Sequence, residues 1–157
     1  MSVIPFTDRE MQRAWRVNLE ASKYTSRTNA HRLLLFYSIE CGLKAIIMKR
    51  MAANCTSLCD QISDAQHNIN KLLDHLSAGQ CLKLPTQLQM PPVKFQGIDT
   101  ERKLDVGKIN QVWRYGGILV QPSSLTSKYT KESGDLDDLI EKHLVQISEW
   151  IQKELNS

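Results

Sequence analysis

Apolar residues recur at helical spacing along most of this chain. Residues 10–24 carry two adjacent apolar stripes with the arginines largely outside them, which is typical of an amphipathic helix. Residues 29–53 are the most apolar segment and predict a buried central helix. Residues 135–156 combine acids in the first turn with an unbroken apolar stripe, and therefore predict a long final helix. That stripe consists of Leu136, Leu139, Ile140, His143, Leu144, Ile147, Trp150, Ile151 and Leu155.

Polar residues mark where these helices begin. Thr7 and Glu10 form the capping-box pattern, in which each side chain satisfies a free backbone N–H group of the other's segment. Thr28 or Asn29 is the expected cap of the central helix, and Asp135 is the expected cap of the last one. These positions define three long helices.

The middle of the chain is less regular. Residues 65–76 predict a third helix, whereas residues 79–98 hold three prolines without a sustained period and predict a long ordered loop. Helical spacing resumes over residues 99–115, and two glycines at 116–117 stop it before a polar connection at 118–134. No useful length alternates like a strand. We therefore predict one domain over 1–157, an all-α, up-and-down bundle of four to five helices.

Composition excludes several classes of protein. A chain of 157 residues is long enough to bury a core without disulfides or metals. The net charge of +3, from 20 basic and 17 acidic residues, is too small to indicate DNA binding through bulk electrostatics. The bases concentrate in the first third and the acids in the last helix, so we expect much of this asymmetry to cancel internally if the two are neighbours.

Membrane and secretory signals are absent from the sequence. No apolar run approaches the roughly 20 residues that span a bilayer, and the best candidate, 33–48, contains Glu40 and Lys44. The first ten residues do not resemble a signal peptide. The cysteines at 41, 55, 59 and 81 are therefore expected to be free thiols in a reducing cytoplasm.

Spacing argues against a metal site and against a nucleophilic enzyme. Cys55, Cys59, His67 and His75 match no compact zinc motif, because the two histidines would lie about 12 Å apart along a helix. The sequence has no nucleophile elbow and no phosphate-binding glycine loop. We expect neither a metal nor another cofactor.

Candidate chemistry instead comes from polar residues on apolar helices. Tyr37, Glu40 and Lys44 lie on the central helix, and Glu40 and Lys44 are four residues apart and can pair. Gly42 between them permits another helix to approach closely. The remaining candidates are His67 and Asn68, which open the third helix, and Arg114 and Tyr115, which close the fourth.

Three of these stretches carry a resemblance: YSIECGLKAIIMK (37–49), HNINKLLDHL (67–76) and VWRY (112–115). Together they resemble the HEPN superfamily. The resemblance implies a small helical bundle that forms homodimers through its long helices. It also implies a place in a prokaryotic defence or toxin–antitoxin system, with RNA, a nucleotide or a partner protein encoded nearby as the ligand.

Catalytic HEPN members resemble metal-independent ribonucleases that use an Arg and a following His with four to six residues between them. In that pair, His moves the 2′-OH proton and Arg stabilises the charged phosphorane. No His follows Arg114 at this distance, and Arg27 and His31 are one residue too close. We therefore expect a binding module without the standard ribonuclease site. The alternatives are a divergent metal-independent endoribonuclease that uses Arg114 and a structural adaptor that docks through the helix containing Trp150.

The residues around Arg114 leave several roles open. Trp113 and Tyr115 are expected to close a core. Arg114 would then pair with buried Glu40, bind phosphate or nucleotide at a dimer groove, join an unusual nuclease site with Tyr115, His31 or His67, or remain solvated.

Overall fold

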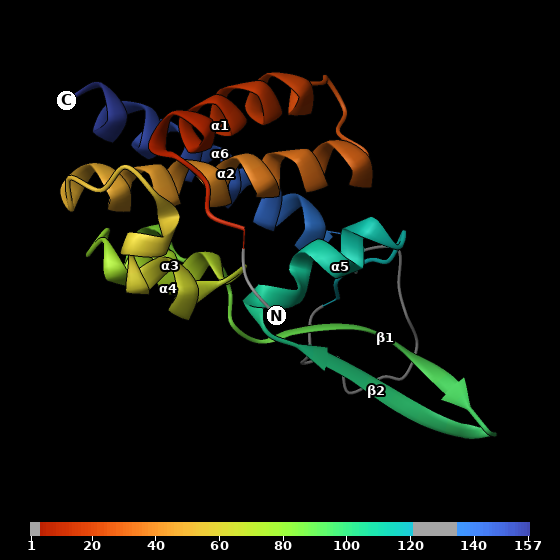
Figure 1. Ribbon diagram of the computed structural model, residues 1–157. Coiled ribbons are helices and arrows are strands. Elements are labelled where there is room, and N and C mark those ends of the chain that lie inside the picture. Colours follow the sequence, from red (N-terminus) through yellow and green to blue (C-terminus); the bar gives the residue numbers. More distant parts are fainter. Residues whose placement is uncertain (1–3, 121–134) are drawn as a thin grey trace.

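The computed structural model describes residues 4–120 and 135–157. Within these ranges it contains six α-helices and one two-stranded antiparallel sheet (Figure 1). The expectation of a helical bundle is confirmed in this coarse form. The elements are α1 (Asp8–Ser22), α2 (Asn29–Arg50), α3 (Asp60–Ala65), α4 (Ile69–His75), β1 (Leu88–Phe95), β2 (Ile98–Leu104), α5 (Ile109–Arg114) and α6 (Asp135–Asn156), with short 3-10 turns at Thr56–Leu58, Gln80–Leu82 and Val106–Lys108.

Helix α2 lies at the centre of the molecule, as its composition predicts. In Figure 1, α1 lies along one side of α2, α3 to α5 lie on the other side, and α6 passes behind it. Leu35, Phe36, Ile39 and Leu43 of α2 are wholly buried. No helix in the described ranges is long and apolar enough to cross a bilayer.

Gly42 lets three helices meet, which confirms the expected close approach. A Cβ atom on Gly42 would lie 2.8 Å from Cγ2 of Ile151 in α6 and 2.9 Å from Cε3 of Trp15 in α1. Because real Cβ contacts are not this short, α1 and α6 can pack here only against a residue that has no side chain.

The predicted caps of α1 and α2 and the glycine stop after α5 are confirmed. Thr7 and Glu10 form both bonds of the capping box, and Thr28 caps α2 with the His31 side chain bonded to its backbone N–H. Gly116 follows α5 with a φ of +73°, a conformation that favours glycine. The capping role expected of Asp135 lies outside the described side chains.

Charges in the first third and the last helix do cancel in part. Arg27 and Arg32 both pair with Glu141, at 3.3 and 2.9 Å, and Arg32 also reaches Asp138. The cancellation does not extend to α1. Among the described residues, no carboxylate forms an ion pair with its three arginines, Arg9, Arg13 and Arg16.

The third helix differs from its prediction. Its expected range, 65–76, is divided between the end of α3 and the whole of α4. The break lies at Gln66, whose φ of 52° and ψ of −113° are incompatible with either helix. Helical spacing predicted one helix here because both short helices place apolar residues on the same buried side.

The expected absence of strands is wrong. Residues predicted as a loop (79–98) and as the start of a helix (99–115) form the β1–β2 hairpin, and the later helix is only Ile109–Arg114. A pair of prolines concealed the strands. Pro91 and Pro92 argue against a strand, but they lie at a register shift between Met90 and Val93, where the ladder is interrupted and proline is tolerated.

We predict that Gly42→Val destabilises the fold by about 2 kcal/mol or more, because the added methyl groups collide with Ile151 and Trp15. The measurement is the free energy of unfolding in urea. Ala21→Val adds similar bulk at an exposed position of α1 and should change that free energy by less than about 0.5 kcal/mol. Equal effects of the two substitutions would contradict the packing described for Gly42.

Candidate functional site

A buried charged cluster lies in the middle of α2. Lys44 Nζ lies 3.0 Å from Glu40 Oε2, so the predicted pair between these residues is confirmed. His67, in the link between α3 and α4, places Nδ1 2.8 Å from the other carboxylate oxygen of Glu40. Both oxygens of one buried carboxylate therefore have a partner, which offsets the cost of burying its charge.

This cluster keeps Glu40 ionised. Burial raises the pKa of the Glu40 carboxyl, but the hydrogen bond from His67 and the charge of Lys44 outweigh burial, and the net pKa lies below its ordinary value. An ionised Glu40 accepts a hydrogen bond from Nδ1–H of His67. This hydrogen bond holds a proton on Nδ1. Nε2 is the ring nitrogen left free to accept a proton, and the side chain is 54% exposed.

Arg114 does not join this cluster, so the predicted buried pair between Arg114 and Glu40 is wrong. Its guanidinium is exposed and donates a hydrogen bond to the Tyr37 hydroxyl of α2 instead. Glu40 needs no third partner, because Lys44 and His67 already occupy its two oxygens. Tyr37 and Glu40 are three residues apart, so Arg114 and His67 are anchored on α2 about 4.5 Å apart along the helix axis.

The two aromatics beside Arg114 have different environments. Trp113 is buried, as expected, and its indole N–H donates to the buried carboxylate of Asp137, 2.8 Å away in α6. Tyr115 was expected to close the core as well, but it is 78% exposed. Helix α5 is short and turns only one face inward. Tyr115 comes directly after this helix and lies on the outer surface.

Two hollows border the exposed face of α5. One has a volume of about 260 Å³ and lies between α5, the preceding 3-10 turn and the α3–α4 link. The other has a volume of about 430 Å³ and lies between α5 and the root of the hairpin. Lys108 and Gln111 line both hollows, and we refer to the two hollows together as the α5 trough. It is further lined by His67, Asn68 and Lys71 at one end and by Arg102 and Tyr115 at the other.

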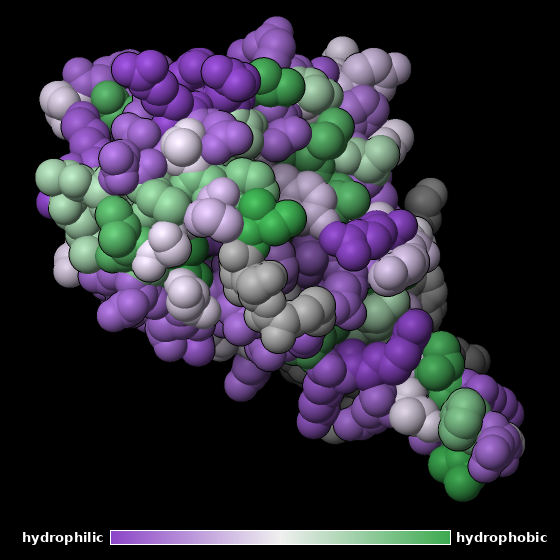
Figure 2. All heavy atoms as spheres, viewed as in Figure 1, coloured by the Kyte–Doolittle hydropathy of each residue, from purple (hydrophilic) through white to green (hydrophobic). Residues whose placement is uncertain are grey.

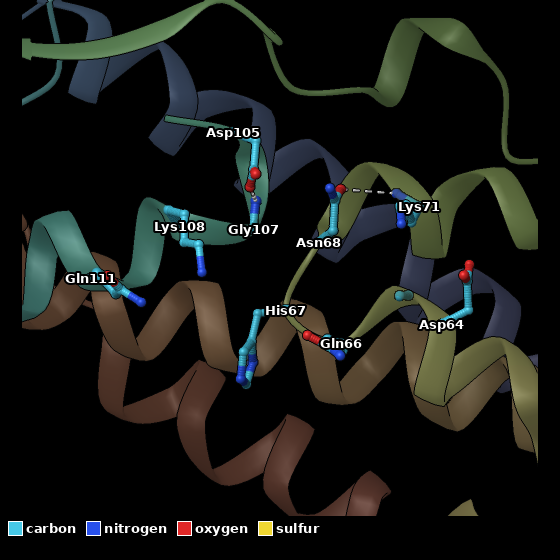
Figure 3. Close-up of a pocket in the computed structure, with 10 residues that line it drawn as sticks. Asp64, Gln66, His67, Asn68, Lys71, Asp105, Gly107, Lys108 and Gln111 are labelled. Atoms are coloured by element: carbon cyan, nitrogen blue, oxygen red, sulfur yellow. Dashed lines mark hydrogen bonds between the residues drawn. The ribbon is translucent and has the colours of Figure 1, made fainter. Parts of the chain in front are cut away.

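Unpaired cations dominate this trough and its border. Figure 3 shows His67, Lys108 and Gln111 pointing into the same space from separate elements. In the described part of the chain, none of Lys71, Lys108 and Arg114 forms an ion pair with a carboxylate. Each of the two lining acids has a hydrogen-bond partner: Asp64 bonds His75 at 2.9 Å, and Asp105 accepts the N–H of Gly107 at 2.8 Å. The cations without a carboxylate partner make the trough suited to an anionic ligand.

Sequence reasoning identified part of this site. It singled out His67 and Arg114, but it did not consider Lys108 and Gln111. Lys108, Gln111 and Arg114 follow one another at intervals of three residues, and this spacing could have indicated a shared polar surface. It was hidden because the predicted helix began at residue 99, well before α5. Asn68 has a structural role, because its side chain accepts a hydrogen bond from the Lys71 N–H and caps α4.

The cysteines and His31 line neither of the two hollows. All four cysteines are free thiols. Among the described residues, no group of three or more His, Cys, Asp or Glu side chains could hold a metal ion. His31 bonds Thr28 and stacks on Tyr24 at the start of α2. No protein-family model matches the chain, and no curated protein or solved structure shows significant similarity to it.

We predict that Glu40→Gln lowers the free energy of unfolding by about 3 kcal/mol at pH 7, because it leaves Lys44 as a buried, unpaired charge. The folded-state pKa of Glu40 is depressed, so its stabilisation is present above the ordinary pKa of 4.5 and is lost as the pH falls through the lower folded value. The gap between parent and variant should therefore narrow below pH 4.5. Urea unfolding at several pH values measures this, and a gap independent of pH would contradict it.

Proposed function

We propose that this chain is a HEPN-like module of a prokaryotic defence or toxin–antitoxin system that binds RNA or a nucleotide, without the standard ribonuclease site, in the cytoplasm. Two kinds of support combine here. The three stretches that resemble HEPN proteins supply the biological setting, and the unpaired cations of the α5 trough supply the ligand class. A helical bundle is compatible with that family, although fold alone does not determine function.

The observation that carries the proposal is the state of Arg114. Its guanidinium is exposed and is held by the neutral hydroxyl of Tyr37, so its charge is not consumed by a carboxylate. A guanidinium presents several N–H donors in a planar fork that matches two phosphate oxygens. Lys108, at the start of α5, adds a second exposed cation. This arrangement recognises a phosphate backbone rather than a single buried anion.

Exposed Tyr115 favours an unpaired nucleotide as the ligand. Its ring lies beside the trough at the hairpin end, next to Arg102 and Lys108. A base can stack on an exposed aromatic ring while cations hold the neighbouring phosphates, which is the common mode of binding single strands. We therefore favour single-stranded RNA or a nucleotide over a duplex.

We predict that the protein binds a labelled single-stranded RNA with an affinity that falls as salt rises from about 50 to about 200 mM. Arg114→Ala should weaken binding about tenfold, because it removes a charged phosphate contact. Arg13→Ala is the matched control, since it removes an equal charge from the exposed face of α1, across α2 from the trough, and should change affinity by less than about twofold. Fluorescence anisotropy measures both.

Two results would count against RNA binding. Salt-independent binding would exclude phosphate contacts, and equal losses for the two arginine variants would show that net charge, not the trough, attracts the RNA. If no RNA or nucleotide is retained at all, the adaptor alternative becomes the better proposal, with α6 and its half-buried Trp150 as the docking helix. Co-purification with products of neighbouring genes then becomes the direct test.

The second candidate, a divergent metal-independent endoribonuclease, is favoured by one specific contact. His67 is oriented through Nδ1 by the buried carboxylate of Glu40, which is how a general base is commonly prepared in enzymes. The anchors of His67 and Arg114 lie one turn apart on α2. An Arg and a His that the sequence separates by 47 positions are thus brought to neighbouring parts of one surface.

Incubation of purified protein with total RNA in EDTA separates the two candidates. The endoribonuclease predicts cleavage that is lost in both Arg114→Ala and His67→Ala but retained in His31→Ala, a matched histidine that bonds Thr28 instead. The binding module predicts intact RNA with all four proteins. Cleavage that survives His67→Ala would exclude the Glu40–His67 pair as the base.

A further inference from the structure

The β1–β2 hairpin projects from the bundle and carries exposed apolar side chains at its tip (Figures 1 and 2). Val93, Phe95 and Ile98 are 40%, 66% and 69% exposed. Isolated two-stranded hairpins are only marginally stable in water, and exposed apolar groups gathered at one place indicate an interaction surface. We therefore expect the tip of the hairpin to contact a partner.

The strand register places these residues on one mostly apolar face of the hairpin, which Thr100 and Arg102 interrupt. Phe95 is opposite Ile98, and Leu88 at the root is opposite Leu104. Because side chains alternate between faces, the even-numbered residues of β2 and their partners in β1 share one side of the hairpin. The root of that side is packed against the bundle, where Leu88 is buried, while its outer half is uncovered.

The two edges of the hairpin are not equivalent. The root of β1 is bridged by Val120, and its middle contains Pro91 and Pro92, which cannot donate backbone hydrogen bonds. The outer edge of β2 has no ladder partner among the described residues. A regular strand with an open edge is a template for another strand, so pairing is expected at β2.

We propose that the occupant of this edge is the β2 strand of a second copy of the chain, paired antiparallel about a two-fold axis. The sequence of β2, IDTERKL, is largely self-complementary. The register that pairs all seven residues places Ile98 opposite the partner's Leu104 and Asp99 opposite the partner's Lys103. Each of these pairs occurs twice, as an isologous interface requires. Opposite charges and apolar residues facing across strands both stabilise a sheet.

The same register covers the exposed tip. It creates a four-stranded sheet in which Leu88, Leu104, the partner's Ile98 and the partner's Phe95 form one row across the apolar face. The tip of each copy thereby reaches the root of the other, beside the hollow lined by Val112 and Tyr115. The partner's tip would therefore form one border of the α5 trough.

One contact in this interface is unfavourable. Glu101 lies opposite the partner's Glu101 on the axis, and like charges directly opposite destabilise a sheet. Lys103, whose Nζ is 3.6 Å from Glu101, lies on the same face and partly compensates. Together with the short length of β2, this contact implies a weak dimer, with a Kd of micromolar order.

A charge-reversal experiment tests the pairing directly. Sedimentation velocity from about 1 to about 500 µM covers the range of a small interface, and the parent chain should shift from monomer to dimer within it. Asp99→Lys and Lys103→Asp should each raise the dimer Kd about tenfold or more, because each replaces both charge pairs by repulsions. Mixing the two variants in equal amounts should restore a dimer, since every Lys then faces an Asp.

The outcomes separate the possibilities cleanly. A parent that stays monomeric over this range, or two variants that remain monomeric when mixed, overturns the proposal. Asp99 also faces Lys94 within the hairpin, so Asp99→Lys could disturb the hairpin itself. Such a disturbance would not be reversed by mixing the two variants, so a dimer restored on mixing indicates pairing between the β2 strands. The result is independent of ligand binding, because sedimentation is measured on the protein alone.

Discussion

A carboxylate buried in the middle of the central helix constrains much of this structure. Glu40 occupies the most apolar segment of the chain, where an unpartnered charge would be prohibitively costly. Lys44 supplies one partner from the same helix, and His67 supplies the other from a distant part of the sequence. The α3–α4 link is thus held against α2, and this contact places the first wall of the α5 trough.

The trough exists because several short elements meet around α5. Helix α5 has six residues and turns Ile109, Val112 and Trp113 into the core. Gln111 and Arg114 of this helix are exposed, and so are Lys108 before it and Tyr115 after it. The hairpin that precedes α5 forms the second wall. Since both oxygens of Glu40 already have partners, Arg114 stays available to a ligand. Had Arg114 paired with Glu40 inside the bundle, it could not contact a phosphate.

The two proposals place different demands on one surface. Phosphate binding depends on cations that lack internal partners, whereas strand pairing depends on an open edge and an uncovered apolar face. The open edge and the uncovered apolar face are features that a partner would cover. The two demands meet at the hairpin root, where Arg102 and Tyr115 line the trough beside the row that a second copy would complete.

Local pattern determined the long helices, the caps of α1 and α2 and the Glu40–Lys44 pair, because each depends on residues within a few turns of one another. Tertiary structure decided the partners of Glu40 and Arg114, since these contacts join residues 27 and 77 positions apart. It also decided the hairpin, whose prolines are tolerated only because the ladder is interrupted where they lie. The spacing of apolar residues shows which side of a helix is buried. Which strands pair, and which charged groups pair, depends on distant segments that compete for the same partner in the folded chain.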